Sequence, residues 1–125
     1  MATEQKLDIV SLPANADLSA KQYYIVKLSN SSGTARVALA GVDDRPIGVL
    51  QGKPAAAGRA ADVAVSGITK VVLGGSVTAG DALTPDSNGK AITNGSSDAY
   101  TIGVALVSGS SGDTISMLIQ KTGTA

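Results

Sequence analysis

Ile47-Gly48-Val49 and Ile102-Gly103-Val104 are two copies of one phrase, and they begin 55 residues apart (102 − 47 = 55). Each copy follows a turn-rich stretch and opens a run in which small residues alternate with branched ones. The preceding segments also correspond, since Leu28 and Leu83 each lead through a polar turn to a glycine and a short apolar run. Self-similarity at a fixed spacing constrains the whole fold. We therefore expect two related β modules in one domain, with a chance match of short phrases as the alternative.

The composition excludes several kinds of chemistry. The chain has 125 residues, no Cys and no His, and its only aromatic residues are three tyrosines. Missing His removes the commonest general base and metal ligand, and missing Cys removes thiolate sites and disulfides. Ten basic and ten acidic residues cancel, so the chain lacks the basic field of a nucleic-acid binder. We expect no catalytic residue, no cofactor, no metal site and no nucleic-acid partner.

The surface predicted from this composition is weakly charged. Charged residues make up 16% of the chain, against an average of about 25%. Ser, Thr, Asn, Gly and Ala must cover the rest of the surface, which costs little to desolvate and suits packing against other proteins. No stretch approaches the ~20 apolar residues of a membrane helix. The polar N-terminus leads into no signal-peptide apolar core, so we expect synthesis in a cytoplasm and no membrane partner.

Short alternating runs separated by turns predict about nine strands and no helix, hence an all-β fold, a small barrel or sandwich. The run 100–107 is the longest, with Ile102, Val104 and Leu106 on one face. Asn88-Gly89 is a strong signal for a hairpin turn. The predicted strands cover residues 23–28, 36–40, 47–51, 61–66, 68–73, 82–84, 90–93, 100–107 and 114–120. As an alternative, 61–66 and 68–73 form one strand that continues through a bend or bulge at Gly67.

The first 20 residues read as an extended N-terminal arm that precedes a β domain at 21–125. The arm carries one apolar cluster before Pro13, formed by Leu7, Ile9, Val10 and Leu12. The alternation of Leu7 and Ile9 permits a short strand. Such a strand can pair with the edge of its own sheet or with that of a neighbouring protein.

Asp43-Asp44-Arg45 is the one acidic cluster that merits weighing as a catalytic group. Two carboxylates beside a cation can serve as a general acid and an anion clamp. Adjacent carboxylates in a loop are more often solvated. We therefore expect no catalysis from this loop.

Four phrases resemble a known family. They are Ala79 to Leu83 (Ala-Gly-Asp-Ala-Leu), Asn88 to Lys90 (Asn-Gly-Lys), Ile102 to Ala105 (Ile-Gly-Val-Ala) and Gly112 to Ile115 (Gly-Asp-Thr-Ile). In this order, in a short all-β chain that begins with a polar arm, they resemble the decoration or head-stabilising proteins of tailed-bacteriophage capsids. The resemblance covers roughly residues 22 to 120.

The resemblance implies a structural virion protein that binds the outer surface of the capsid and cements the assembled shell. It implies the major capsid protein as a partner, a homo-trimer on the capsid, and neither catalysis nor a cofactor. It also implies an arm that orders against the shell, which assigns partner binding to Leu7, Ile9, Val10 and Leu12. Two alternatives stay open: an all-β subunit of a phage tail, fibre or surface filament, and a glycan- or ligand-binding β module.

Overall fold

The computed structural model describes residues 7–95 and 99–122, and within them it contains nine β-strands and no helix. The all-β prediction is therefore confirmed. The strands are β1 (Leu7–Pro13), β2 (Ile25–Ser31), β3 (Thr34–Leu39), β4 (Gly48–Leu50), β5 (Ala60–Val72), β6 (Ala82–Pro85), β7 (Ala91–Thr93), β8 (Thr101–Ala105) and β9 (Thr114–Thr122).

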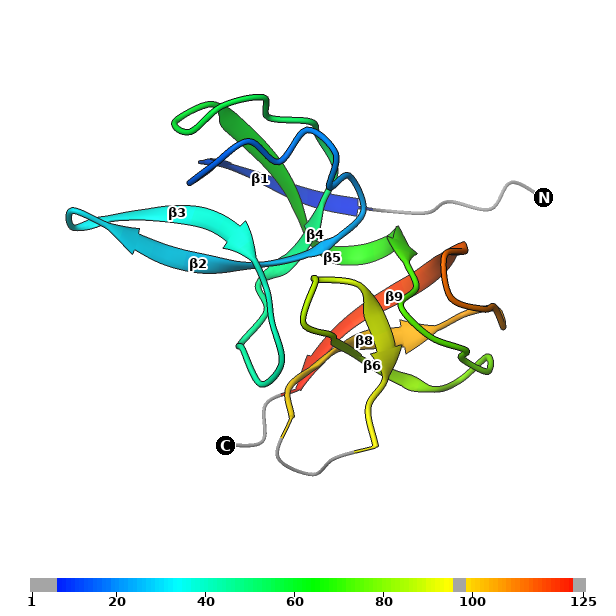
Figure 1. Ribbon diagram of the computed structural model, residues 1–125. Coiled ribbons are helices and arrows are strands. Elements are labelled where there is room, and N and C mark those ends of the chain that lie inside the picture. Colours follow the sequence, from blue (N-terminus) through cyan, green and yellow to red (C-terminus); the bar gives the residue numbers. More distant parts are fainter. Residues whose placement is uncertain (1–6, 96–98, 123–125) are drawn as a thin grey trace.

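One strongly curled antiparallel sheet contains all nine strands. Its order is β3-β2-β4-β5-β9-β8-β6-β7, and β1 pairs with β5 beside this path. In Figure 1, β1 to β4 gather around the first half of β5, and β6, β8 and β9 gather around its second half. The 13-residue strand β5 therefore joins two groups of strands.

The strand order is the same in both groups. From β5 outward the first group reads β5-β4-β2-β3, and from β9 outward the second reads β9-β8-β6-β7. In each group a hairpin comes first in the chain, followed by a short central strand and a longer closing strand. We call residues 7–66 the first repeat and residues 68–122 the second. Gly67, with a φ of 101°, lies between them inside β5.

Strand register shows that the two repeats correspond residue by residue. Val26 pairs with Gly48 in the first repeat, and Leu83 pairs with Gly103 in the second. The two glycines belong to the duplicated phrase, so the expectation of two related β modules agrees with the strand pairing. The structure aligns Leu83 with Val26, whereas the sequence pattern had matched it with Leu28.

The same correspondence reaches the first strand of the chain. A parallel bridge joins Ala14 to Val37, and an equivalent bridge joins Leu73 to Ala91. β1 is thus the counterpart of the C-terminal half of β5. The 13 residues of β5 close the first repeat with one half and open the second with the other.

Two apolar clusters form the core. Cluster 2 lies inside the first repeat, and its buried members are Ala14, Leu18, Val26, Val37, Leu50, Ala61 and Val63. Their counterparts in the second repeat all belong to cluster 1: Leu73, Val77, Leu83, Ala91, Ala105, Ile115 and Met117. Cluster 1 also contains Ile25, Ala40, Val49 and Ala64 of the first repeat. The second repeat therefore covers one face of the first.

The stretch around Gly67 and the run 100–107 compare most informatively with their predictions. β5 is the longest strand and passes through Gly67, which agrees with the alternative of one continuous strand there, while β8 has only five residues. A register shift between Thr101 and Gly103 offsets the pairing of β8 with β9 by one residue, so the side chains after it change face. Ile102 is consequently buried while Leu106 is 42% exposed. The prediction that Ile102, Val104 and Leu106 share one face was wrong because strict alternation does not survive a β-bulge.

Candidate partner-binding surfaces

The loop Asp43-Asp44-Arg45 is held as a structural turn. Lys27 Nζ and the Gly41 backbone N–H both donate hydrogen bonds to Asp44 Oδ2, at 2.8 Å and 2.7 Å. The bond from Lys27 is the largest influence on the pKa of Asp44 and holds it below its ordinary value. A carboxylate that is ionised and accepts two hydrogen bonds has no proton to donate, so it is a poor general acid. Asp44 therefore fixes the loop that delivers Arg45 and Pro46.

Residues 7–95 and 99–122 contain no group of three or more His, Cys, Asp or Glu side chains placed to hold a metal ion. In the same two stretches, no helix has the length and apolar character that crossing a membrane requires.

Strand β1 contains the four apolar residues of the predicted arm. It pairs antiparallel with β5 from Leu7 to Pro13. Ile9 is 50% exposed and Val10 is 41% exposed, whereas Leu7 and Leu12 are half-buried and pack against clusters 1 and 2. β1 thus presents two large apolar side chains to solvent and keeps two against the core. Residues 1–6 of the arm lie outside the described residues.

Polar bonds between β1 and β5 fix this strand in register. Ser11 Oγ donates to Asp62 Oδ1 at 2.9 Å, and Ser66 Oγ donates to Asp8 Oδ2 at 2.6 Å. Among the described residues, the opposite edge of β1 is bridged to β3 only beyond the end of the strand, at Ala14. The rest of this edge offers backbone N–H and C=O groups to which another strand can bond.

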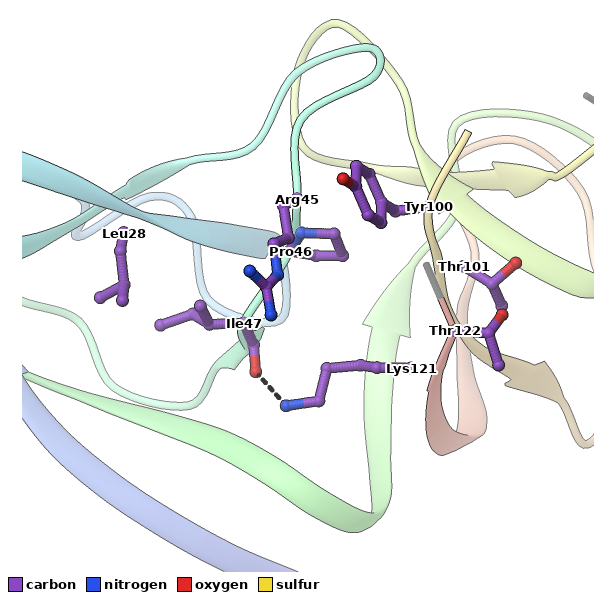
Figure 2. A pocket seen from close by; sticks show the side chains of 8 residues that line it. All are labelled: Leu28, Arg45, Pro46, Ile47, Tyr100, Thr101, Lys121 and Thr122. Atoms are coloured by element: carbon purple, nitrogen blue, oxygen red, sulfur yellow. Dashed lines mark hydrogen bonds between the residues drawn. The ribbon is translucent and has the colours of Figure 1, made fainter. Parts of the chain in front are cut away.

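A groove of about 560 Å³ lies where the two repeats meet (Figure 2). One wall comes from β2 and the loop before β4, and the other from the segment before β8 and the end of β9. The lining residues are Leu28, Arg45, Pro46, Ile47, Tyr100, Thr101, Lys121 and Thr122. Arg45 and Tyr100 each stand two residues before a copy of the Ile-Gly-Val phrase.

Two cations lie in this groove. Lys121 Nζ donates a hydrogen bond to the Ile47 carbonyl oxygen at 2.8 Å, which ties the end of β9 to the first repeat. Although Lys121 is an exposed residue, partial withdrawal of its ammonium group from water lowers its pKa. The charge of Arg45 lowers that pKa further. Among the described residues that line the groove, none carries a negative charge.

An apolar row crosses the outer face of each repeat. In the second repeat Ala82, Val104, Leu118 and Ile68 are neighbours on β6, β8, β9 and β5. The counterpart row in the first repeat is Ile25, Val49, Ala64 and Ile9. The first three residues of that row are buried in cluster 1. In the second repeat Leu118 is 38% exposed. The second repeat therefore covers the row of the first repeat, whereas its own row remains open to solvent at Leu118.

Comparison with known proteins places the chain in a family. A family model described as phage cement protein matches residues 3–120. Among solved structures, the fold resembles "The crystal structure of head fiber gp8.5 N base in bacteriophage phi29". The TM-score is 0.72 and the sequence identity is 18%, over 92% of this chain and 95% of that chain. No curated protein sequence gives a significant match.

The two results bear on different questions. At 18% identity the similarity to the head fiber base supports a shared fold alone. The family match spans nearly the whole chain, including both copies of the Ile-Gly-Val phrase. On that ground the protein belongs to the phage cement protein family and is a structural protein that stabilises a bacteriophage capsid.

Proposed function

We propose that the protein binds the outside of an assembled capsid, with the major capsid protein as its partner, and has no catalytic activity. The match to the phage cement family carries this proposal. A cement works through weak contacts repeated by the symmetry of the shell, so each copy needs only a modest surface. In this proposal the protein is made in the host cytoplasm and ends on the virion exterior.

The shell contact in this proposal is β1, through Leu7, Ile9, Val10 and Leu12. Ile9 and Val10 contribute most because they are the large apolar side chains that β1 exposes. The edge of β1 that no other described strand pairs with also allows a capsid segment to add as a further strand. Apolar burial gives about 25 cal/mol per Å², so two partly exposed side chains repeated over a lattice supply useful binding.

The test is co-sedimentation of the purified protein with undecorated shells of its own phage. The Ile9→Thr/Val10→Thr variant keeps β-branched side chains and so preserves the strand. We expect its affinity for shells to fall about tenfold, equivalent to roughly 1.4 kcal/mol. Val42→Thr is the matched control, because Val42 is exposed in a loop outside β1. An equal loss of shell affinity in both variants would contradict the assignment of β1 as the shell contact.

Self-association is the second part of the proposal. A second copy covers the open row of Ala82, Val104 and Leu118, because the equivalent row of the first repeat is already covered by a β repeat of the same kind. In such a contact, one surface of a copy binds a different surface of the next copy, and the copies close into a ring when the rotation between them permits. A homo-trimer is the smallest ring built from such contacts. Leu118→Lys should reduce oligomers in analytical ultracentrifugation and leave the monomer folded. Unchanged assembly would exclude this face.

Similarity to a head fiber base favours a second candidate, a base that anchors a fibre to the capsid. Immuno-electron microscopy of intact particles separates the two readings. A cement occupies lattice positions over the whole shell, whereas a fibre base lies under a projecting fibre.

A further inference from the structure

Arg45 and Lys121 both line the groove between the repeats, and none of the described residues that line it is acidic. The Ile47 carbonyl oxygen accepts one hydrogen bond from Lys121. In the two described stretches the one ion pair joins Lys27 to Asp44, so neither groove cation has an acidic partner there. Two like charges drawn together raise the electrostatic energy of the folded chain. An anion in the groove would relieve this repulsion.

The local charge does not follow from the charge of the whole chain, which is zero. Three carboxylates near the surface are bonded elsewhere, Asp8 to Ser66, Asp62 to Ser11 and Asp44 to Lys27, and Asp43 does not line the groove. The described lining of the groove is therefore a positively charged patch on a protein with no net charge. Such a patch selects an oppositely charged group on a partner.

The rest of the lining suits a polypeptide. Leu28 is 49% exposed, and together with Pro46, Ile47 and the Tyr100 ring it gives the groove apolar walls. The volume of about 560 Å³ falls within the range of sites that enclose side chains or small ligands. A carboxylate between the cations and an aliphatic stem along these walls would use both kinds of surface.

We infer that the groove receives an Asp or Glu side chain from a segment of the capsid protein, and this inference rests on the proposed shell-binding function. The Arg45 guanidinium can donate two parallel hydrogen bonds to a carboxylate. Lys121 adds a point charge from the second repeat. Because the two cations come from different repeats, the bound carboxylate would also bridge them.

The experiment uses the full-length protein and undecorated shells in a titration by co-sedimentation. The test variant is Arg45→Gln/Lys121→Gln. The matched control is Lys53→Gln/Arg59→Gln, which also removes two positive charges, from exposed residues outside the groove. Arg45→Lys/Lys121→Arg keeps both charges. Thermal melting of each variant without shells shows that it is folded.

We expect the neutral groove variant to bind shells about tenfold more weakly or worse, the loss typical of a charge-assisted hydrogen bond. The control should bind like the wild type, and the charge-conserving variant should recover most of the affinity. Polyglutamate should release the wild type from shells more effectively than a single-stranded oligonucleotide of equal charge. Stronger competition by the oligonucleotide would contradict a carboxylate ligand and indicate a phosphate.

The two hypotheses fail in different ways. Wild-type binding that the groove variant retains in full would overturn the groove while leaving shell binding intact. A wild-type protein that does not bind shells would overturn the proposed function itself.

Discussion

Gly48 and Gly103 occupy the same position in the two repeats and meet the same kind of atom. A Cβ on Gly48 would overlap the Ala64 carbonyl oxygen, and a Cβ on Gly103 would overlap that of Leu118. Both glycines stand in the middle of the Ile-Gly-Val phrase, where a short strand is hydrogen-bonded to a neighbour on each side. The phrase is repeated because each repeat needs a strand without a side chain at this point.

Substituting either glycine by alanine should therefore destabilise the fold strongly. We expect Gly48→Ala and Gly103→Ala each to lower the free energy of unfolding by about 3 kcal/mol, the upper end for overpacking in a close-packed site. Chemical denaturation measures this. Gly52→Ala is the control, because the nearest atom to its added Cβ lies at 3.8 Å. A loss as large in Gly52→Ala as in the other two would contradict the close approach.

The part of the fold that local patterns determine could be predicted from sequence. Alternation gave the strands, and Asn88-Gly89 gave the hairpin between β6 and β7. The order of strands in the sheet needed long-range pairing that no local pattern encodes. The groove was missed, although Arg45 was weighed as an anion clamp, because Lys121 meets Ile47 across 74 residues. The position of Arg45 and Tyr100, two residues before each copy of the phrase, was the signal available.

Tyr23 adopts a left-handed backbone where the second repeat has a glycine. Its φ is 68°, and its N–H donates to the Leu50 carbonyl oxygen as that of Gly80, with a φ of 93°, donates to Ala105. A left-handed residue with a Cβ costs roughly 1–2 kcal/mol. We expect Tyr23→Gly to be more stable than Tyr23→Ala by about 1 kcal/mol, the reverse of the usual order.

Thermal or urea unfolding of the two Tyr23 variants compares them directly, because both lose the same ring. In the converse experiment, Gly80→Ala should lower the free energy of unfolding by about 1 kcal/mol. Backbone strain alone accounts for this loss, because nothing lies within 4 Å of the added Cβ. If Tyr23→Ala were the more stable of the pair, strain at this position would be refuted.

The ion pair of Asp44 should appear in the acid stability of the protein. Its pKa is lowered in the folded state from 3.8, chiefly by the bond from Lys27. A lowered carboxyl pKa adds stability that is present above about pH 4 and is lost as the pH falls through the folded-state value. We expect Asp44→Asn to cost about 0.5–1 kcal/mol at neutral pH and to flatten this part of the pH profile.

The control for Asp44 is Asp43→Asn. Asp43 is exposed, and its positive φ of 65° suits asparagine. Urea unfolding between neutral and acidic pH should show the wild-type slope in Asp43→Asn. The same flattened slope in both variants would assign the acid dependence to another group.

The pKa of Lys121 should depend on the charge of Arg45. Burial is the main cause of its lowered pKa, and the charge of Arg45 adds to it. We expect Arg45→Gln to raise the pKa of Lys121 toward its ordinary value, because removing a nearby positive charge favours the protonated ammonium. NMR of the lysine side chain against pH measures the change. A pKa that stays the same or falls would mean that the two cations do not interact.

Capsid stabilisation is tested most directly by the melting temperature of undecorated shells with and without the purified protein. Binding to the assembled shell but not to its dissociated subunits raises the melting temperature by mass action. We expect a saturable increase with added protein, and a smaller one with Ile9→Thr/Val10→Thr at the same concentration. A shell that melts at the same temperature with saturating protein would contradict the assignment as a cement.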